Sequence, residues 1–268
     1  MAADYELSVV IPVFNEEKNI GELLKDWQVI LRAIPVRYRF IIINDGSTDN
    51  SLSILQSLAG EMSAGPQPSS TAVSRQSTIG QPSAVSQPST TGQRPPPITI
   101  HTQTNAGHGP AILAGYRQAL DTEWVFQIDS DHQHDPATFG ILWTNRNKYD
   151  FLLGERKEKN ATLPRKWVSG ASRVIVRLLY GKRVKDVNSP YRLMRCSELK
   201  EVLAFIPNDS FAPNILLTAW FVYFQTRIFT TEISNRTRGV QRQSKMNLYF
   251  LRGCFQSIFQ TILFRFRL

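Results

Sequence analysis

Residues 7–50 read LSVVIPVFNEEKNIGELLKDWQVILRAIPVRYRFIIINDGSTDN, and this stretch decides the fold class. Leu7 to Val13 and Arg39 to Ile43 are runs rich in β-branched residues, which predict two buried strands. Between them, apolar residues from Asn19 to Leu31 recur at helical spacing. A polar turn follows each strand, at Asn15 and at residues 44–47. Strand, helix, strand and a further helix over 49–58 predict an α/β fold with a mostly parallel sheet flanked by helices.

The same alternation continues toward the C-terminus. Further strands are predicted over 98–101, 124–128 and 151–154. Further helices are predicted over 110–120, 164–180, 213–224 and 248–268. Ligands of open parallel sheets bind beyond the carboxyl ends of the strands. We therefore expect the binding residues in the polar turns that follow the strands.

Residues 61–97 interrupt the pattern. Pro, Ser, Gln and Thr dominate this segment, and it contains no aromatic residue. Such a composition buries too little apolar surface to offset its chain entropy, which predicts a disordered insertion. A Pro-rich docking ligand is the alternative. The expected catalytic domain comprises residues 1–60 and 98–246, and an amphipathic C-terminal helix, 247–268, follows it.

The charge of the chain is strongly basic, with 31 Lys and Arg against 22 Asp and Glu and a formal net charge of +9. The excess is concentrated after Arg227, where Glu232 is the only acidic residue. A basic balance favours nucleic acid, phosphorylated metabolites or an acidic membrane surface as partners. Because no nucleic-acid recognition motif accompanies the basic region, we expect no nucleic-acid partner.

The cellular setting is predicted from what the sequence contains. Only two cysteines, Cys196 and Cys254, occur, which favours a reducing, cytoplasmic environment. We expect neither a signal peptide nor a transmembrane helix. The C-terminal helix is amphipathic, and its apolar face carries Leu251, Phe255, Ile258, Phe259, Ile262 and Phe266. This face either packs on the catalytic domain or lies at a membrane interface. We expect a cytoplasmic protein with peripheral contact at the cytoplasmic membrane face.

The sharpest chemical signal follows the strand predicted over 124–128 and reads Asp129-Ser130-Asp131-His132-Gln133. Two carboxylates one residue apart can approach a hard divalent cation that is bound to a diphosphate. Such a cation stabilises the charge on a departing nucleotide. A solvated acidic loop is the alternative. Zinc is not expected, because the rest of a zinc ligand set is absent around these histidines.

Several segments occur in an order that resembles a known family. They are 8–16 (SVVIPVFNE), 43–49 (INDGSTD), 105–109 (NAGHG), 129–131 (DSD), 154–156 (GER) and 186–192 (DVNSPYR). Together they resemble the inverting, family-two type glycosyltransferases of GT-A fold, which include dolichol-phosphate mannose synthase and bacterial polyprenyl-phosphate sugar transferases. The resemblance implies a Rossmann-like GT-A domain. It also implies inverting transfer of a sugar from a GDP- or UDP-linked donor to an acceptor, with a polyprenyl phosphate expected.

The resemblance also implies site residues. For the donor these are Pro12, Phe14, Glu16, Ile43, Asp45, Ser130, Arg156, Arg236 and Lys245. For Mg²⁺ or Mn²⁺ they are Asp129, Asp131 and Gln133. For the acceptor they are Arg165, Ser169 and Arg192, since guanidinium groups bind phosphate oxygens well. The catalytic set is Asp129, Asp131 and Asp186.

The acceptor stays open at this point. Pro190 stands where the family usually has Gly or Asp two residues before Arg192, and the late basic motif is expanded over 236–245. A phosphate acceptor needs little help from a base, whereas a hydroxyl acceptor, as in a soluble enzyme acting on a glycan, needs one. Asp186 and Asp209 are the candidates for that base. A catalytically silent nucleotide-sugar binder is a further alternative, against which the two carboxylates of 129–131 argue.

Overall fold

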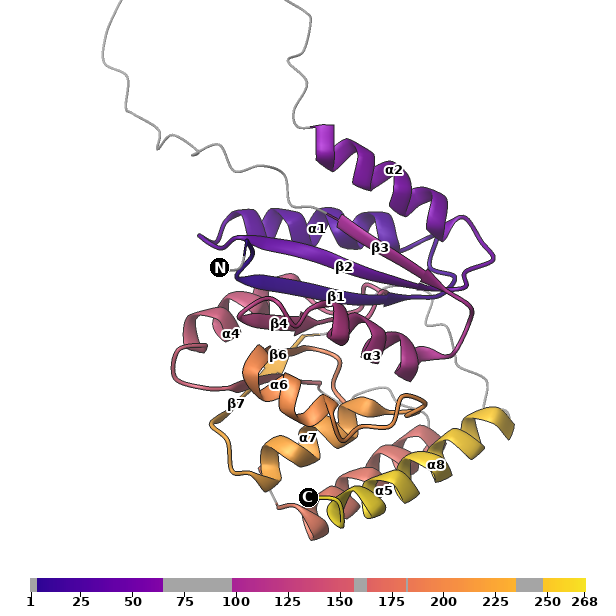
Figure 1. Ribbon diagram of the computed structural model, residues 1–268, viewed down its shortest axis with the longest axis vertical. Coiled ribbons are helices and arrows are strands. Elements are labelled where there is room, and N and C mark those ends of the chain that lie inside the picture. Colours follow the sequence, from indigo (N-terminus) through magenta and orange to yellow (C-terminus); the bar gives the residue numbers. More distant parts are fainter. Residues whose placement is uncertain (1–3, 65–97, 157–162, 182, 235–247) are drawn as a thin grey trace, which may run out of the picture.

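The computed structural model describes residues 4–64, 98–156, 163–181, 183–234 and 248–268. Within them, seven strands form one sheet in the order β3-β2-β1-β4-β6-β5-β7 (Figure 1). The strands are β1 (Leu7–Val13), β2 (Tyr38–Asp45), β3 (Ile98–Gln103), β4 (Trp124–Gln127), β5 (Phe151–Arg156), β6 (Arg192–Arg195) and β7 (Ile228–Ile233). The helices are α1 (Ile20–Arg32), α2 (Ser51–Ala64), α3 (His108–Gln118), the 3-10 turn η1 (Pro136–Thr138), α4 (Phe139–Asn145), α5 (Leu163–Leu179), α6 (Cys196–Leu203), α7 (Pro213–Tyr223) and α8 (Leu248–Arg265).

The sheet is mostly parallel, as the sequence predicts. β3, β2, β1 and β4 run parallel, and β6 runs antiparallel to both β4 and β5. In the register, Val13 lies opposite Asn44, and Val10 lies opposite Gln127. The carboxyl ends of β1, β2 and β4 therefore meet at one edge of the sheet, where the polar turns are.

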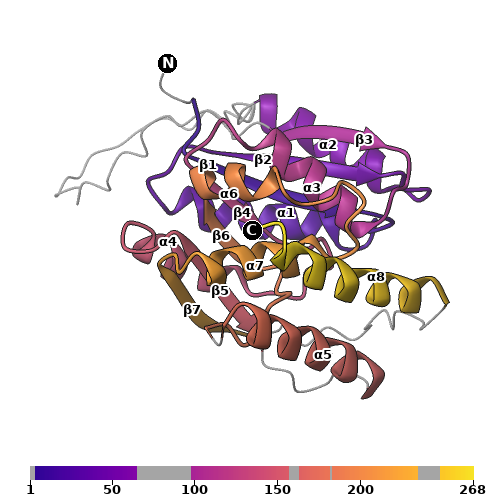
Figure 2. The same ribbon diagram turned by 60° about the horizontal axis from the view of Figure 1, so that its bottom comes forward.

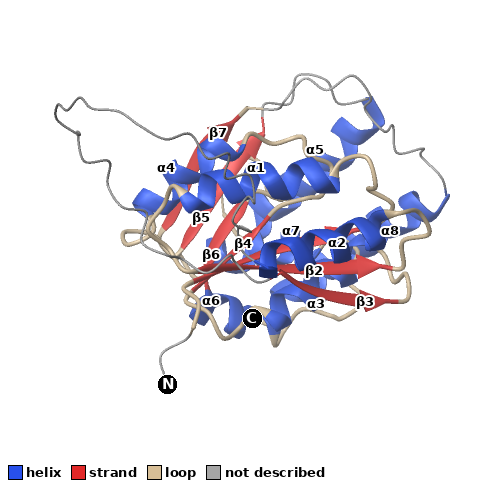
Figure 3. Cartoon of the chain, turned by 90° about the horizontal axis from the view of Figure 1, so that it is seen from above, coloured by secondary structure: helices blue, strands red, loops and turns tan. Residues whose placement is uncertain are grey.

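Helices cover both faces of the sheet and enclose a separate core on each (Figure 3). One core holds side chains of α1, α2 and α4, with Trp27 packed against Phe126 and Phe139. The other core holds side chains of α3, α5, α6, α7 and α8. Here the stacked rings of Phe151 and Phe221 join β5 to α7. Burial of this much apolar surface is the main favourable contribution to folding.

α8 lies beside α5 along one side of the molecule (Figures 1 and 2). The Tyr180 hydroxyl, just after α5, donates to the Thr261 carbonyl at 2.5 Å, and Arg265 Nε donates to the Leu179 carbonyl at 3.1 Å. The face of α8 that packs inward carries mostly small residues: Gly253, Cys254, Ser257, Thr261 and Phe264.

The apolar face predicted for α8 points away from the domain. Phe255, Phe259 and Phe266 are 72%, 62% and 83% exposed, and Ile262 is also exposed. Leu178 on the neighbouring α5 is exposed as well. Of the two alternatives for this face, packing on the catalytic domain is wrong for these side chains, because they are exposed. No helix in the described part of the chain has the length and apolar character needed to cross a membrane.

The loop before α7 lies between α8 and α3. A Cβ atom on Gly109 would overlap the carbonyl oxygens of Ser210 and Phe211, and one on Gly253 would overlap the Phe211 ring. Ser210 Oγ also donates to Gln260 Oε1 at 3.1 Å. The backbone of residues 210–211 therefore contacts the start of α3, and the side chains of the same two residues contact α8.

The insertion predicted over 61–97 begins later than expected, because α2 continues to Ala64. Residues 65–97 lie outside the described part of the chain, so the expectation of disorder there stays a prediction.

Candidate active site

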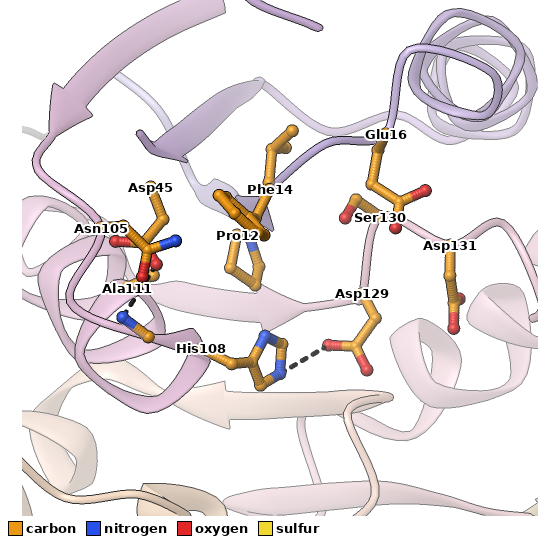
Figure 4. A pocket seen from close by; sticks show the side chains of 12 residues that line it. Pro12, Phe14, Glu16, Asp45, Asn105, His108, Ala111, Asp129, Ser130 and Asp131 are labelled. Atoms are coloured by element: carbon orange, nitrogen blue, oxygen red, sulfur yellow. Dashed lines mark hydrogen bonds and ion pairs between the residues drawn. The ribbon is translucent and has the colours of Figure 1, made fainter. Parts of the chain in front are cut away.

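An open pocket of about 410 Å³ lies at the carboxyl ends of β1, β2 and β4 (Figure 4). Its lining consists of Pro12, Val13, Phe14, Glu16, Asp45, Asn105, Gly107, His108, Ala111, Asp129, Ser130 and Asp131. Seven residues from the predicted donor and metal sets therefore meet here: Pro12, Phe14, Glu16, Asp45, Asp129, Ser130 and Asp131.

Hydrogen bonds hold the turns after β1 and β2 against each other. Asn15, in a left-handed conformation at φ 55°, accepts the backbone N–H of Thr48 at 2.8 Å through its side-chain oxygen. The backbone N–H of Glu16 donates to Ser51 Oγ at 2.7 Å. Asp49 accepts from the Ser51 backbone N–H and hydroxyl at the start of α2, which is the role of a capping residue. The pocket rim is thus fixed by the polar residues that end the strands.

Asp45 holds a third turn in place. Its Oδ1 accepts from the backbone N–H of Ala106 at 2.9 Å and from Gln103 Nε2 at 2.8 Å, and its Oδ2 accepts from the backbone N–H of Gly107 at 2.9 Å. Asp45 is only 2% exposed. The carboxylate therefore positions the turn before α3, and this turn brings His108 to the pocket.

Asp129 and Asp131 follow β4 and supply two of the four carboxyl groups that line the pocket. Burial and the charge of Asp129 raise the pKa of Asp131 to about 6. Burial acts in the same direction on Asp129, but His108 outweighs it and lowers the pKa of Asp129. The pocket thus favours the ionised form of Asp129 and opposes the ionisation of Asp131. Placing a cation between them would relieve this repulsion.

His108 is the nearest basic group to Asp129, with Nε2 at 3.4 Å from Oδ1. Desolvation lowers the pKa of His108, but the charges of Asp129, Asp131 and Asp45 outweigh it and raise the pKa. Sequence reasoning left His108 and Asn105 out of the site residues, although both line the pocket. Their position after the third parallel strand was the available signal, since all strand ends of such a sheet face the same side.

Arg156 and Asp186 form a two-point ion pair beside the pocket. Nε of Arg156 donates to Asp186 Oδ2 at 2.7 Å, and Nη2 donates to Oδ1 at 3.1 Å. Burial raises the pKa of Asp186, but the pairing with Arg156 outweighs it and lowers the pKa. A carboxylate held in this way is a weak proton acceptor.

Two predicted site residues lie in the interior. Arg192 is 0% exposed, and its guanidinium donates to the carbonyls of Ser189 and Asn214. It is not accessible to an acceptor and instead joins β6 to α7. Ile43 is 1% exposed and packs in the core that includes α3. Its side chain is a core residue of β2 and is not part of the pocket lining.

The remaining predicted site residues lie outside the pocket lining or outside the described part of the chain. Gln133 donates its backbone N–H to Asp131 Oδ1 at 3.2 Å, and its side chain is not part of the pocket lining. Arg165 and Ser169 belong to α5, in a part whose side chains lie outside the described structure. Arg236 and Lys245 lie outside the described residues altogether. Asp209 accepts from Gln256 of α8, away from the pocket lining.

The mostly parallel sheet with antiparallel β6, and the acidic pocket at the carboxyl ends of β1, β2 and β4, define a GT-A fold. Residues 8–86 match the model of Glycosyl transferase family 2. This match agrees with the resemblance to family-two glycosyltransferases seen in the sequence.

Curated and solved proteins agree with this assignment. The chain is 25% identical over 243 residues to the undecaprenyl-phosphate 4-deoxy-4-formamido-L-arabinose transferase of Pseudomonas fluorescens, covering 90% of this chain and 61% of that protein. S. aureus TarS 1-349 in complex with UDP-GlcNAc has a TM-score of 0.54 at 18% identity, covering 96% of this chain and 66% of that chain. Glucosyl-3-phosphoglycerate synthase from Mycobacterium tuberculosis, in complex with Mn²⁺, UDP and glucosyl-3-phosphoglycerate, has a TM-score of 0.56 at 16% identity, covering 97% and 80%. The chain thus spans about three fifths of the length of the curated relatives it matches.

Proposed function

We propose that the protein is an inverting glycosyltransferase that moves a sugar from a nucleotide-diphosphate sugar to a polyprenyl phosphate, with a divalent cation at Asp129 and Asp131. One observation carries the proposal. The carboxyl ends of β1, β2 and β4 bring an exposed aromatic ring, Phe14, and the two carboxylates into one pocket of about 410 Å³. A pocket of this size and composition suits a nucleotide diphosphate.

The donor would lie across this pocket. Phe14 is 43% exposed at the rim and can stack on a base, while Glu16 and Asp45 can accept from base or ribose donors. UDP and UDP-GlcNAc are ligands of the structural neighbours, which supports a UDP-linked donor here. A GDP-linked sugar is the other donor that the pocket chemistry allows. Arg156 lies close enough to Asp129 to lower its pKa and could also face a donor phosphate.

The carboxylate pair fits a Mg²⁺ or Mn²⁺ ion. Asp129 and Asp131 are hard oxygen ligands, and burial together with the charge of Asp129 raises the pKa of Asp131 to about 6. Within the described residues, no three His, Cys, Asp or Glu side chains gather into a metal site. The pair would therefore hold the ion together with diphosphate oxygens, as is usual for Mg²⁺. The bound ion would stabilise negative charge on the departing nucleotide.

The chemistry of the site favours an acceptor that is already anionic. Direct displacement with inversion by a hydroxyl requires a base, and the carboxylate of Asp186 is engaged by Arg156 and has a lowered pKa. A phosphate acceptor is ionised near neutral pH and needs no such base. The curated relatives are named for transfer to undecaprenyl phosphate, which supports the same acceptor class. A soluble enzyme acting on a glycan hydroxyl is the alternative.

The exposed face of α8 supports peripheral contact with a membrane that holds such an acceptor. Phe255, Phe259 and Phe266 project from α8, and the exposed Arg252 and Arg267 belong to the same helix. Apolar rings with flanking basic residues are typical of helices that lie in an anionic membrane interface. We therefore propose that the protein contacts the cytoplasmic membrane face peripherally through α8.

The test is a product assay on the purified protein with GDP- and UDP-linked sugars, Mn²⁺ or Mg²⁺, and either a polyprenyl phosphate or a panel of soluble glycans. We expect a glycosylated polyprenyl phosphate by mass spectrometry, and none with Asp131→Ala. If only the glycans were glycosylated, the proposed lipid acceptor would be wrong, and the protein would still be a glycosyltransferase. Binding of a nucleotide sugar without any transfer would instead indicate a silent binder.

A further inference from the structure

A buried amide is directed at the pocket from inside the protein. Gln127, the last residue of β4, is 0% exposed, and it shares with Val125 the face of the strand that α3 and α7 cover. Its Nε2 donates to Asp129 Oδ1 at 3.3 Å. A buried amide is costly unless its donors and acceptor are satisfied, so the partners of Gln127 are informative about its role.

The opposite end of the Gln127 amide is held by two further buried side chains. Tyr116 of α3 donates its hydroxyl to Gln127 Oε1 at 2.9 Å, and Asn214 of α7 donates Nδ2 to the same oxygen at 2.9 Å. Because Oε1 receives both donors, the NH₂ group of Gln127 is turned toward Asp129. The same Tyr116 hydroxyl lies 3.1 Å from Asn214 Oδ1, which closes the set.

Asp129 is thus contacted on one oxygen from two sides. Gln127 Nε2 reaches Oδ1 from the protein interior, and His108 Nε2 lies 3.4 Å from that same oxygen on the pocket side. Oδ2 makes neither of these contacts. The arrangement fixes the rotation of the carboxylate and directs one oxygen to the protein and the other to the ligand space.

We propose that Gln127, oriented by Tyr116 and Asn214, is a positioning residue that sets the orientation in which the Asp129 carboxylate meets the cation. This deepens the proposed function, because it rests on a cation at Asp129 and Asp131. Groups that hydrogen-bond to ligating carboxylates fix their direction, and their loss typically weakens metal binding about 10- to 100-fold.

The test measures Mn²⁺ binding in the presence of UDP, by electron paramagnetic resonance of free Mn²⁺, in the intact chain without acceptor. Gln127→Met keeps the length of the side chain and removes the amide, and we expect about tenfold weaker Mn²⁺ binding. Tyr116→Phe removes one of the two donors that turn the amide, and we expect a smaller weakening, about two- to threefold. In turnover assays, the Mn²⁺ concentration for half-maximal rate should rise more than kcat falls.

Thr122→Val is the matched control. Thr122 is buried and lies just before the start of β4, at the end of the strand opposite Gln127. Its hydroxyl contacts Ser8 Oγ and the carbonyls of Ala119 and Trp124. Its loss should lower the melting temperature and leave Mn²⁺ binding unchanged, which separates positioning from a general loss of stability.

The outcomes distinguish this inference from the function on which it rests. If Asp131→Ala abolishes Mn²⁺ binding but Gln127→Met and Tyr116→Phe bind as the wild type does, the positioning role is wrong and the metal site stands. If the wild type binds no Mn²⁺ with UDP, both are overturned. If Thr122→Val weakens binding as much as Gln127→Met does, the effect is one of stability and the inference fails.

Discussion

Asp131 lies two residues after Asp129 in the turn that follows β4, and the charge of Asp129 adds to burial in opposing the ionisation of Asp131. Burial and the negative charge of Asp129 together raise the pKa of Asp131 from 3.8 to about 6. In the metal-free protein, ionising Asp131 therefore costs more free energy than ionising an Asp side chain in the unfolded chain. This electrostatic penalty is the part of the site that a bound cation would remove, and it leads to the first two predictions.

Asp131→Asn should stabilise the metal-free protein while abolishing transfer. The folded protein holds a proton on Asp131 up to about pH 6, and the unfolded chain releases it near pH 3.8, so the free energy of unfolding falls as pH rises through that window. Removing the charge should recover on the order of 2 kcal/mol at pH 7.5. Thermal unfolding in EDTA should show a melting temperature several degrees above that of the wild type. An equal or lower melting temperature would contradict the proposed repulsion.

Stabilisation by Mn²⁺ and UDP should depend on pH in the opposite sense. At pH 7.5 both carboxylates can ionise around the ion, and saturating ligand should raise the melting temperature of the wild type. Below about pH 6 a proton competes for Asp131, so the increase should shrink. A thermal-shift series from pH 5 to pH 8 measures this. An increase that is independent of pH would place the ion elsewhere.

Asp186→Asn separates the two acceptor classes. With a phosphate acceptor, the change removes only the support that Asp186 gives to Arg156, and we expect kcat/KM to fall about tenfold or less. With a hydroxyl acceptor and Asp186 as the base, the loss would be about 10²- to 10⁴-fold. Steady-state kinetics on a polyprenyl phosphate with the matched Asp186→Glu variant decides between them.

Removing two rings from α8 should release the protein from anionic vesicles. Phe255→Ser with Phe259→Ser removes apolar surface that is 72% and 62% exposed, so the melting temperature should change little while membrane partitioning drops. Sedimentation with vesicles containing anionic lipid, at low and high salt, measures this. Val29→Ser, an equally exposed apolar position on α1, is the control and should bind as the wild type does. Vesicle binding that persists in the double variant would remove α8 from the interface.

Replacing residues 65–97 with a short Gly-Ser linker from Ala64 to Ile98 should preserve donor binding. The segment has the composition of a chain that forms no core, and α2 and β3 are complete on either side of it. Thermal unfolding and UDP binding compare the shortened and full-length proteins. A lost cooperative transition would show that the segment contributes to the fold.

The sequence predicted the elements with strong apolar patterns and missed those without them. β1 was predicted at its observed bounds because it is a run of mostly apolar, β-branched residues, and all of them are buried in the structure. β6 reads RLMR, so that its two arginines hid a short strand between β4 and β5. The short helices α4 and α6 were missed for a related reason, since few turns give little periodicity.

The site shows a similar division. Motif resemblance located the turns around the pocket, because residues that end parallel strands must converge. It did not distinguish exposed from buried arginines. The guanidinium of Arg192 donates to the carbonyl group of the nearby Ser189 and to that of Asn214 in α7, and no local pattern places α7 beside Arg192. The exposure of the α8 rings could not be predicted from the sequence either. An amphipathic pattern defines two faces of a helix, but it does not indicate which face packs against the domain.

The contacts of Gly109 and Gly253 with residues 210–211 have a consequence for how an acceptor would reach the site. Neither position has room for a side chain, so the spacing between α8 and the turn that carries His108 is set by the backbone of residues 210–211 and the ring of Phe211. A bilayer that binds α8 would therefore hold the pocket at a constant height above its headgroups. The acceptor headgroup would then have to cover that height itself, and acceptors would be selected by reach as well as by chemistry.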